Sequence, residues 1–191
     1  INKEYAYSLF MQFKYDEAIP LYEKLIAQGF DNFESNFILG LCYEDQPDNE
    51  KALKHYQKAV HFKSDNATCL FHLALVEKAF NMDSLSMAHF NQSLEVSLPK
   101  GRALRTYKWL ADLHFQHHRY ADAARDFELC TLYDEEDNPL NYYNAAQMLI
   151  ASKNKLKAKL YLQMFLANAN RLEDKKEAAQ LISKAKEQLK Q

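Results

Sequence analysis

The chain has 191 residues, of which 48% are hydrophobic, and a formal net charge of −2. This length suits one domain, and the absence of a basic excess argues against DNA or RNA as a partner. With only three glycines and four prolines, the composition favours long helices and short turns, and a glycine-rich phosphate loop is not expected.

Paired helical segments follow one another along the chain. Apolar spacing predicts helices over residues 3–13 and 16–28, with Gly29 as the stop, and a second pair around 39–43 and 51–59. Between the latter two, Pro47 cannot continue a helix and Asp48 suits a cap. Further helices are expected over 67–80, 84–97, 102–116, 120–133, 140–152 and 156–169.

The final segment, residues 173–190, has a different pattern. Its apolar residues lie on one helical face and are Ala178, Leu181, Ile182, Ala185 and Leu189. A stack of helical hairpins exposes an apolar surface at its end, so we interpret this segment as a capping helix. The alternative is the first helix of a sixth pair whose second helix is absent.

Two independent markers repeat along the chain. Small residues in the first helices are Ala6, Gly40, Ala74, Ala111 and Ala146, at intervals of 34, 34, 37 and 35. Pairs in the second helices, a small residue followed four positions later by a large one, are Ala18/Tyr22, Ala52/Tyr56, Ser86/Phe90, Ala123/Phe127 and Ala158/Leu162. Their first members have the same four intervals, so the chain consists of repeated helical hairpins.

With its Leu-Gly, Tyr, Ala and aromatic positions, this repeat resembles the tetratricopeptide repeat over essentially the whole chain. The resemblance implies an all-α, right-handed α-solenoid, here of about five repeats (1–32, 33–66, 67–100, 102–137 and 139–172) within one domain over 1–191. The family's closing proline is missing from its position, which holds Phe30, Ser64, Leu98, Glu135 and Asn170.

Catalytic, metal and cofactor sites are not expected. His114, His117 and His118 have spacings found in helical metal sites, but His114 occupies a position that should point between helices and the other two lie in a turn. The three cysteines are scattered and are expected to be small buried side chains. We therefore predict a non-enzymatic scaffold that binds a protein or peptide with apolar anchors.

The resemblance places ligand contacts on the first helices, three before, one after and four after each small position. The candidate groove residues are Tyr7, Phe10, Phe37, Leu41, Phe71, Leu75, Lys78, Lys108, Asp112, Phe115, Tyr143 and Gln147. Some could instead pack between neighbouring first helices: both alternatives stay open for Phe37, Phe71 and Tyr143, and packing is favoured for Leu41 and Leu75. The Lys, Asn and Arg clamp of chaperone-binding relatives is not expected, and an apolar peptide suits the groove better.

Two other functions remain open from the sequence. The chain could be a sensor or regulatory module of a larger signalling or membrane-anchored protein, or it could self-assemble through its ends into homo-oligomers. The sequence begins at Ile1 without a methionine, so the compartment stays unknown from the sequence: cytoplasmic, or exported if a signal segment was removed upstream. A membrane-spanning run is not expected in this sequence.

Overall fold

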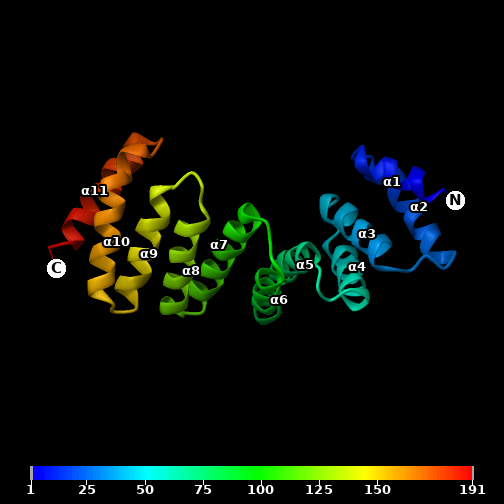
Figure 1. Ribbon diagram of the computed structural model, residues 1–191, viewed down its shortest axis with the longest axis horizontal. Helices are drawn as coiled ribbons and strands as arrows, with labels where there is room; N and C mark the ends of the chain where they lie inside the picture. The colour runs from blue at the N-terminus through cyan, green and yellow to red at the C-terminus, as the bar shows by residue number, and fades with distance from the viewer. Residues whose placement is uncertain (1, 191) are drawn as a thin grey trace. The chain divides into compact units, whose positions relative to one another are not determined.

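The computed structural model describes residues 2–190, and every regular element within this range is helical (Figure 1). The chain forms two compact units, Ile1–Leu98 and Pro99–Gln191. Both units consist of helical hairpins, which confirms the predicted all-α repeat architecture. The handedness, the repeat boundaries and a single continuous domain over 1–191 stay predictions.

The first unit contains three hairpins. Its helices are α1 (Lys3–Met11), α2 (Tyr15–Ala27), α3 (Phe33–Asp45), α4 (Asn49–Phe62), α5 (Ala67–Ala79) and α6 (Asp83–Val96). Side-chain oxygens of Asn32, Asp48 and Asn66 accept hydrogen bonds from the first free backbone N–H groups of α3, α4 and α5. Because these N–H groups have no partner within the helix, such caps fix where each helix begins.

The second unit contains two hairpins and a terminal helix. Its helices are α7 (Lys100–Gln116), α8 (Tyr120–Tyr133), α9 (Pro139–Ala151), α10 (Lys155–Asn168), the 3₁₀ turn η1 (Ala169–Arg171) and α11 (Lys175–Gln188). The interval of 37 between the third and fourth small positions corresponds to a longer helix. Helix α7 has 17 residues, whereas α3, α5 and α9 have 13 each.

The repeated small positions all lie in the interior of the hairpins. Gly40 is buried in α3, and the alanines at the four equivalent positions have no exposed surface. A Cβ atom on Gly40 would lie 2.5 Å from Cε1 of Tyr56, whose ring is fully buried. This contact explains the glycine, because α3 and the Tyr56 ring approach too closely for any side chain.

The terminal helix packs with its apolar face inward, as predicted. Ala178 and Ala185 are buried in a cluster with Phe165 of α10, and the remaining apolar residues of α11 pack against the same cluster. An Asp174 side-chain oxygen accepts hydrogen bonds from two backbone N–H groups at the start of α11. Helix α11 therefore covers apolar surface of the last hairpin.

Candidate functional site

A hollow of about 450 Å³ opens on the first unit where its first helices face outward. Helix α3 supplies three of the six lining residues, and α1, α5 and the first residue of α2 supply one each. The lining residues are Phe10, Tyr15, Leu41, Glu44, Asp45 and His72. The hollow therefore combines aromatic and aliphatic walls with two carboxyl groups, and its lining contains no lysine or arginine.

Glu44 lines the hollow and is held in place by Tyr56 and His72. Its Oε2 atom accepts a hydrogen bond from the Tyr56 hydroxyl at 2.5 Å and lies 2.9 Å from Nδ1 of His72. The His72 ring stacks on Tyr56, with centroids 5.8 Å apart, and meets the Phe71 ring edge-on at 5.4 Å. Because buried rings hold both partners, the carboxylate has a defined position before any ligand arrives.

Asp45 lies at the rim and is solvent-exposed. Within residues 2–190 its carboxylate makes no hydrogen bond or ion pair. Burial, followed by the negative charge of Asp45, raises the pKa of the Tyr15 phenol. An unpaired carboxylate therefore lies close to an aromatic ring at the mouth of the hollow.

The predicted groove residues of the first unit differ in exposure. Tyr7 is 44% exposed, Phe10 and Leu41 are half-buried and line the hollow, and Phe71 is only 1% exposed. Phe37 is half-buried; its ring stacks on Phe33 of the same helix at 5.5 Å and lies 6.3 Å from the His72 ring of α5. Half-buried Leu75 and Lys78 do not line the hollow.

The predicted groove residues of the second unit are equally mixed. Phe115 is 49% exposed, Asp112 is exposed and Lys108 is half-buried. Tyr143 is 6% exposed, and its ring lies 5.0 Å from that of Phe165 in the interior. The side-chain amides of Gln147 and Gln188 form two hydrogen bonds of 3.0 Å with each other, so α11 contacts α9 at this position.

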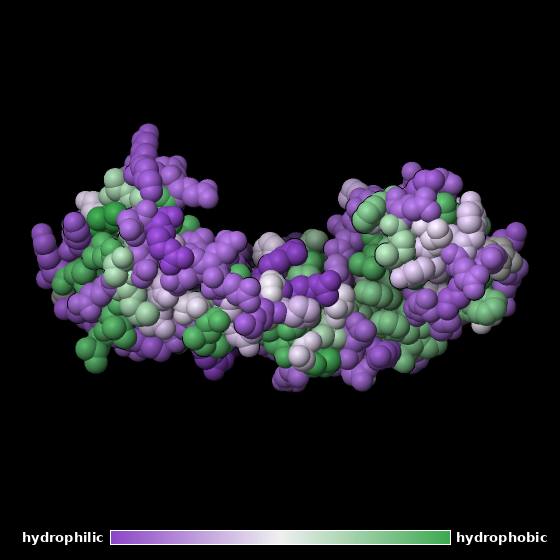
Figure 2. Space-filling model, turned by 45° about the horizontal axis from the view of Figure 1, so that its top comes forward, coloured by the Kyte–Doolittle hydropathy of each residue, from purple (hydrophilic) through white to green (hydrophobic). Residues whose placement is uncertain are grey.

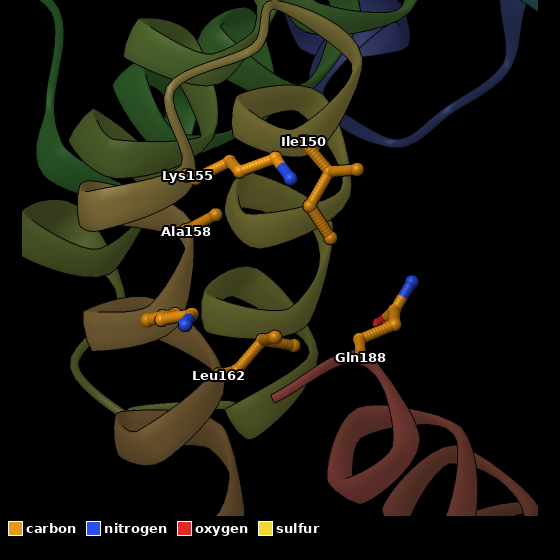
Figure 3. Close-up of a pocket in the computed structure, with 6 residues that line it drawn as sticks. Ile150, Lys155, Ala158, Leu162 and Gln188 are labelled. Carbon is orange, nitrogen blue, oxygen red and sulfur yellow. The ribbon is translucent and has the colours of Figure 1, made fainter. Parts of the chain in front are cut away.

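A smaller pocket of about 100 Å³ lies in the second unit (Figure 3). Ile150 of α9, Lys155 and Leu162 of α10, and Gln188 of α11 line it together with Ala158 and Lys159. Figure 3 shows Lys155 reaching across the pocket towards Ile150. Its size suits no more than a few atoms of a ligand, so the hollow of the first unit is the stronger candidate.

Polar pairs between the two helices of a hairpin have a structural role instead. Equivalent positions, always 12 residues apart, hold Glu77 with His89 (2.7 Å) in the third hairpin and His114 with Asp126 (2.6 Å) in the fourth. In the third hairpin the acid lies on the first helix and the imidazole on the second, and in the fourth hairpin this order is reversed. Burial raises the pKa of Asp126, and His114 opposes this rise. These pairs join the two helices of each hairpin; His114, Asp126 and Glu77 are buried, whereas the His89 side chain is 22% exposed.

The sequence interpretation did not identify four lining residues as candidate contacts. Tyr15, Asp45 and His72 lie outside the three positions per repeat that the resemblance singled out, and Glu44 is at one of them but was not chosen. Their convergence depends on how α1, α2, α3 and α5 pack. A sequence signal existed only for Glu44, whose position shares a helical face with Phe37 and Leu41.

The described residues, 2–190, contain no group of three or more His, Cys, Asp or Glu side chains placed to hold a metal ion. Among these same residues, no helix is both long and apolar enough to cross a bilayer. Apolar and hydrophilic side chains are interspersed over the visible face of each unit (Figure 2).

Comparison with known proteins agrees with the repeat pattern and the fold. Residues 6–67 match the family model described as "Tetratricopeptide repeat". The match covers about a third of the chain, within the first unit. The solved structural neighbours of the chain include MamA, with a TM-score of 0.71 at 14% identity over 90% of this chain and 98% of that chain. Another is YrrB, described as a tetratricopeptide-repeat protein with an unusual peptide-binding site, with a TM-score of 0.74 at 16% identity over 94% of this chain and 89% of that one.

One curated relative is the DnaJ homolog subfamily C member 3 of Gallus gallus, 24% identical over 190 residues. The match covers 91% of this chain but only 38% of the relative's length. At these identities the tetratricopeptide fold is what the chain shares with its structural neighbours.

Proposed function

We propose that this protein is a non-enzymatic scaffold that binds an extended or helical protein segment on the first-helix surface of its first unit. The observation that carries the proposal is the hollow lined by Phe10, Leu41 and His72, with the exposed Tyr7 on the same helix as Phe10. Aromatic and aliphatic side chains in a hollow supply apolar anchoring, and fixed polar groups supply orientation. The peptide-binding site named for the neighbour YrrB is consistent with this use of the fold.

Selection of peptides of about 12 residues from a random displayed library, with the full chain immobilised, tests the proposal. Selected peptides are then synthesised, and their binding is measured by fluorescence polarisation. We expect Tyr7→Ser and Leu41→Ser to weaken binding. Phe62→Ser should not, because Phe62 is 49% exposed and lies at the end of α4, outside the hollow. Circular dichroism confirms that each variant is folded.

If no peptide is selected, or if Phe62→Ser weakens binding as much as Leu41→Ser, the proposal is wrong. Self-association remains the second candidate, favoured by the leucines exposed on α10, Leu156 at 86% and Leu160 at 52%. Light scattering that shows a monomer at high protein concentration would exclude it.

A further inference from the structure

The charge of the hollow indicates which side chain of a bound segment it accepts. Glu44 and Asp45 both contribute to the lining, and His72 is its only basic side chain. Asp16 lies nearby, because its carboxylate accepts a hydrogen bond from Gln46, the residue after Asp45. The mouth of the hollow therefore carries a concentration of negative charge next to apolar walls.

The two carboxylates are placed for different roles. Glu44 is anchored by Tyr56 and His72, as described above, and its side chain is 28% exposed. Asp45 is exposed and makes no ion pair within residues 2–190. An incoming cation would find the half-buried Glu44 carboxylate held in place and the exposed Asp45 carboxylate without an ion pair. Such an arrangement needs no rearrangement of existing ion pairs before it binds a positive charge.

The apolar walls suit the stem of a long basic side chain. Phe10 and Tyr15 lie side by side, with ring centroids 5.9 Å apart, and Leu41 lines the same hollow. Lysine and arginine place a hydrocarbon stem against apolar surface while the charged end reaches polar groups. A cation over an aromatic face gains a further attraction. An acidic side chain would instead meet like charges, and a purely apolar one would cover the Asp45 carboxylate without giving it a partner.

We propose that the hollow between α1, α3 and α5 receives one lysine or arginine side chain of the bound segment, with its charged end at Asp45 and its stem against Phe10, Tyr15 and Leu41. This inference rests on the proposed function, since it assigns the chemistry of the partner at the same surface. The protein then recognises segments in which a basic residue accompanies an apolar anchor.

The library selection described above tests the inference when its sequences are analysed by position. We expect one position of the aligned peptides to be lysine or arginine. In a synthesised peptide, norleucine at that position keeps the hydrocarbon stem and removes the charge, and should lower the affinity about tenfold or more. Asp45→Asn should lower affinity to a similar extent, whereas Asp65→Asn, an equally exposed aspartate in the turn before α5, should leave it unchanged.

A reversal of charge gives the sharpest test. In an Asp45→Lys variant, the peptide that carries glutamate at the selected position should bind more tightly than the original basic peptide. If peptides bind and Leu41→Ser weakens them, but no basic position emerges or Asp45→Asn has no effect, this inference is overturned while the proposed function stands. If the library yields no binder at all, both fail together.

Discussion

A methyl group at position 40 should destabilise the first unit. In the Gly40→Ala variant the added Cβ would lie 2.5 Å from Cε1 and 2.6 Å from Cδ1 of Tyr56. The ring cannot turn away freely, because it is fully buried and its hydroxyl is bonded to Glu44. Overpacking of this kind costs about 1–3 kcal/mol, and so severe a contact belongs near the upper end. The higher helix propensity of alanine relative to glycine offsets about 1 kcal/mol of this cost, so the net loss in the free energy of unfolding is about 2 kcal/mol.

The chain provides a matched control and a rescue for this variant. Gly101 lies in the first turn of α7 with no atom within 4 Å of an added Cβ. Gly101→Ala should therefore stabilise the protein, by up to about 1 kcal/mol. The fifth hairpin already combines alanine and leucine at the equivalent positions, Ala146 and Leu162. The double variant Gly40→Ala/Tyr56→Leu should consequently lose less stability than the sum of its two single changes.

Thiol labelling can measure the effect within the affected unit. Cys42 and Cys69 are buried in the first unit and Cys130 in the second, and burial raises the pKa of all three thiols to about 12. They should therefore react with a labelling reagent only when their surroundings open. We expect Gly40→Ala to accelerate labelling of Cys42 and Cys69, with Cys130 as the internal reference, and to lower the urea midpoint measured by circular dichroism. If Gly40→Ala were as harmless as Gly101→Ala, or if the double variant were strictly additive, the close approach of α3 and Tyr56 would be refuted.

Three further predictions concern other buried groups. Replacing only His114 or only Asp126 by leucine should lower the free energy of unfolding in urea by about 3–5 kcal/mol. Replacing both by leucine should lower it far less, and equal losses in the single and double variants would contradict this. Burial, and secondarily nearby lysines, lower the pKa of His55 below its ordinary 6.5, so its contribution to stability is present above about pH 6.5 and is lost as the pH falls. The wild-type chain should therefore lose more stability than His55→Gln between about pH 7.5 and 5.5, and identical pH profiles would oppose this. Leu162→Ala should lower the free energy of unfolding by about 2–5 kcal/mol, because Leu162 is only 1% exposed. Leu160 is 52% exposed, so Leu160→Ala should lower it by less than about 0.5 kcal/mol, and thermal unfolding of the two variants measures the difference.

The repeat architecture could be predicted from the sequence because hairpin packing imposes local requirements. Each first helix needs a small residue where its partner helix comes closest, and this requirement recurs at every hairpin. The turns show the same regularity: Phe13, Asn81, His118 and Lys153 have positive φ, and their positions follow the intervals of the small residues. Most predicted helices therefore agree with the observed ones to within a few residues, and α8 agrees at both ends, whereas α3 begins at Phe33 and not near residue 39.

The candidate site could be predicted only in part. The periodic pattern identifies first-helix residues that share a face, and two of them, Phe10 and Leu41, line the hollow. The same pattern cannot say which of these side chains remain in contact with solvent. Phe71 and Tyr143 occupy equivalent kinds of position and are buried, because neighbouring aromatic rings cover them.

The sequence by itself determined the number and kind of hairpins, since helix periodicity and small-residue spacing are properties of neighbouring residues in the chain. Tertiary structure alone brought Tyr15, Asp45 and His72 together at one hollow. These residues belong to three different helices, and their distances depend on how the helices pack. It also decided that Asp45 has no ion pair within residues 2–190 while Glu44 is held by Tyr56 and His72, because a carboxylate's partners are set by which side chains lie within about 3 Å of it.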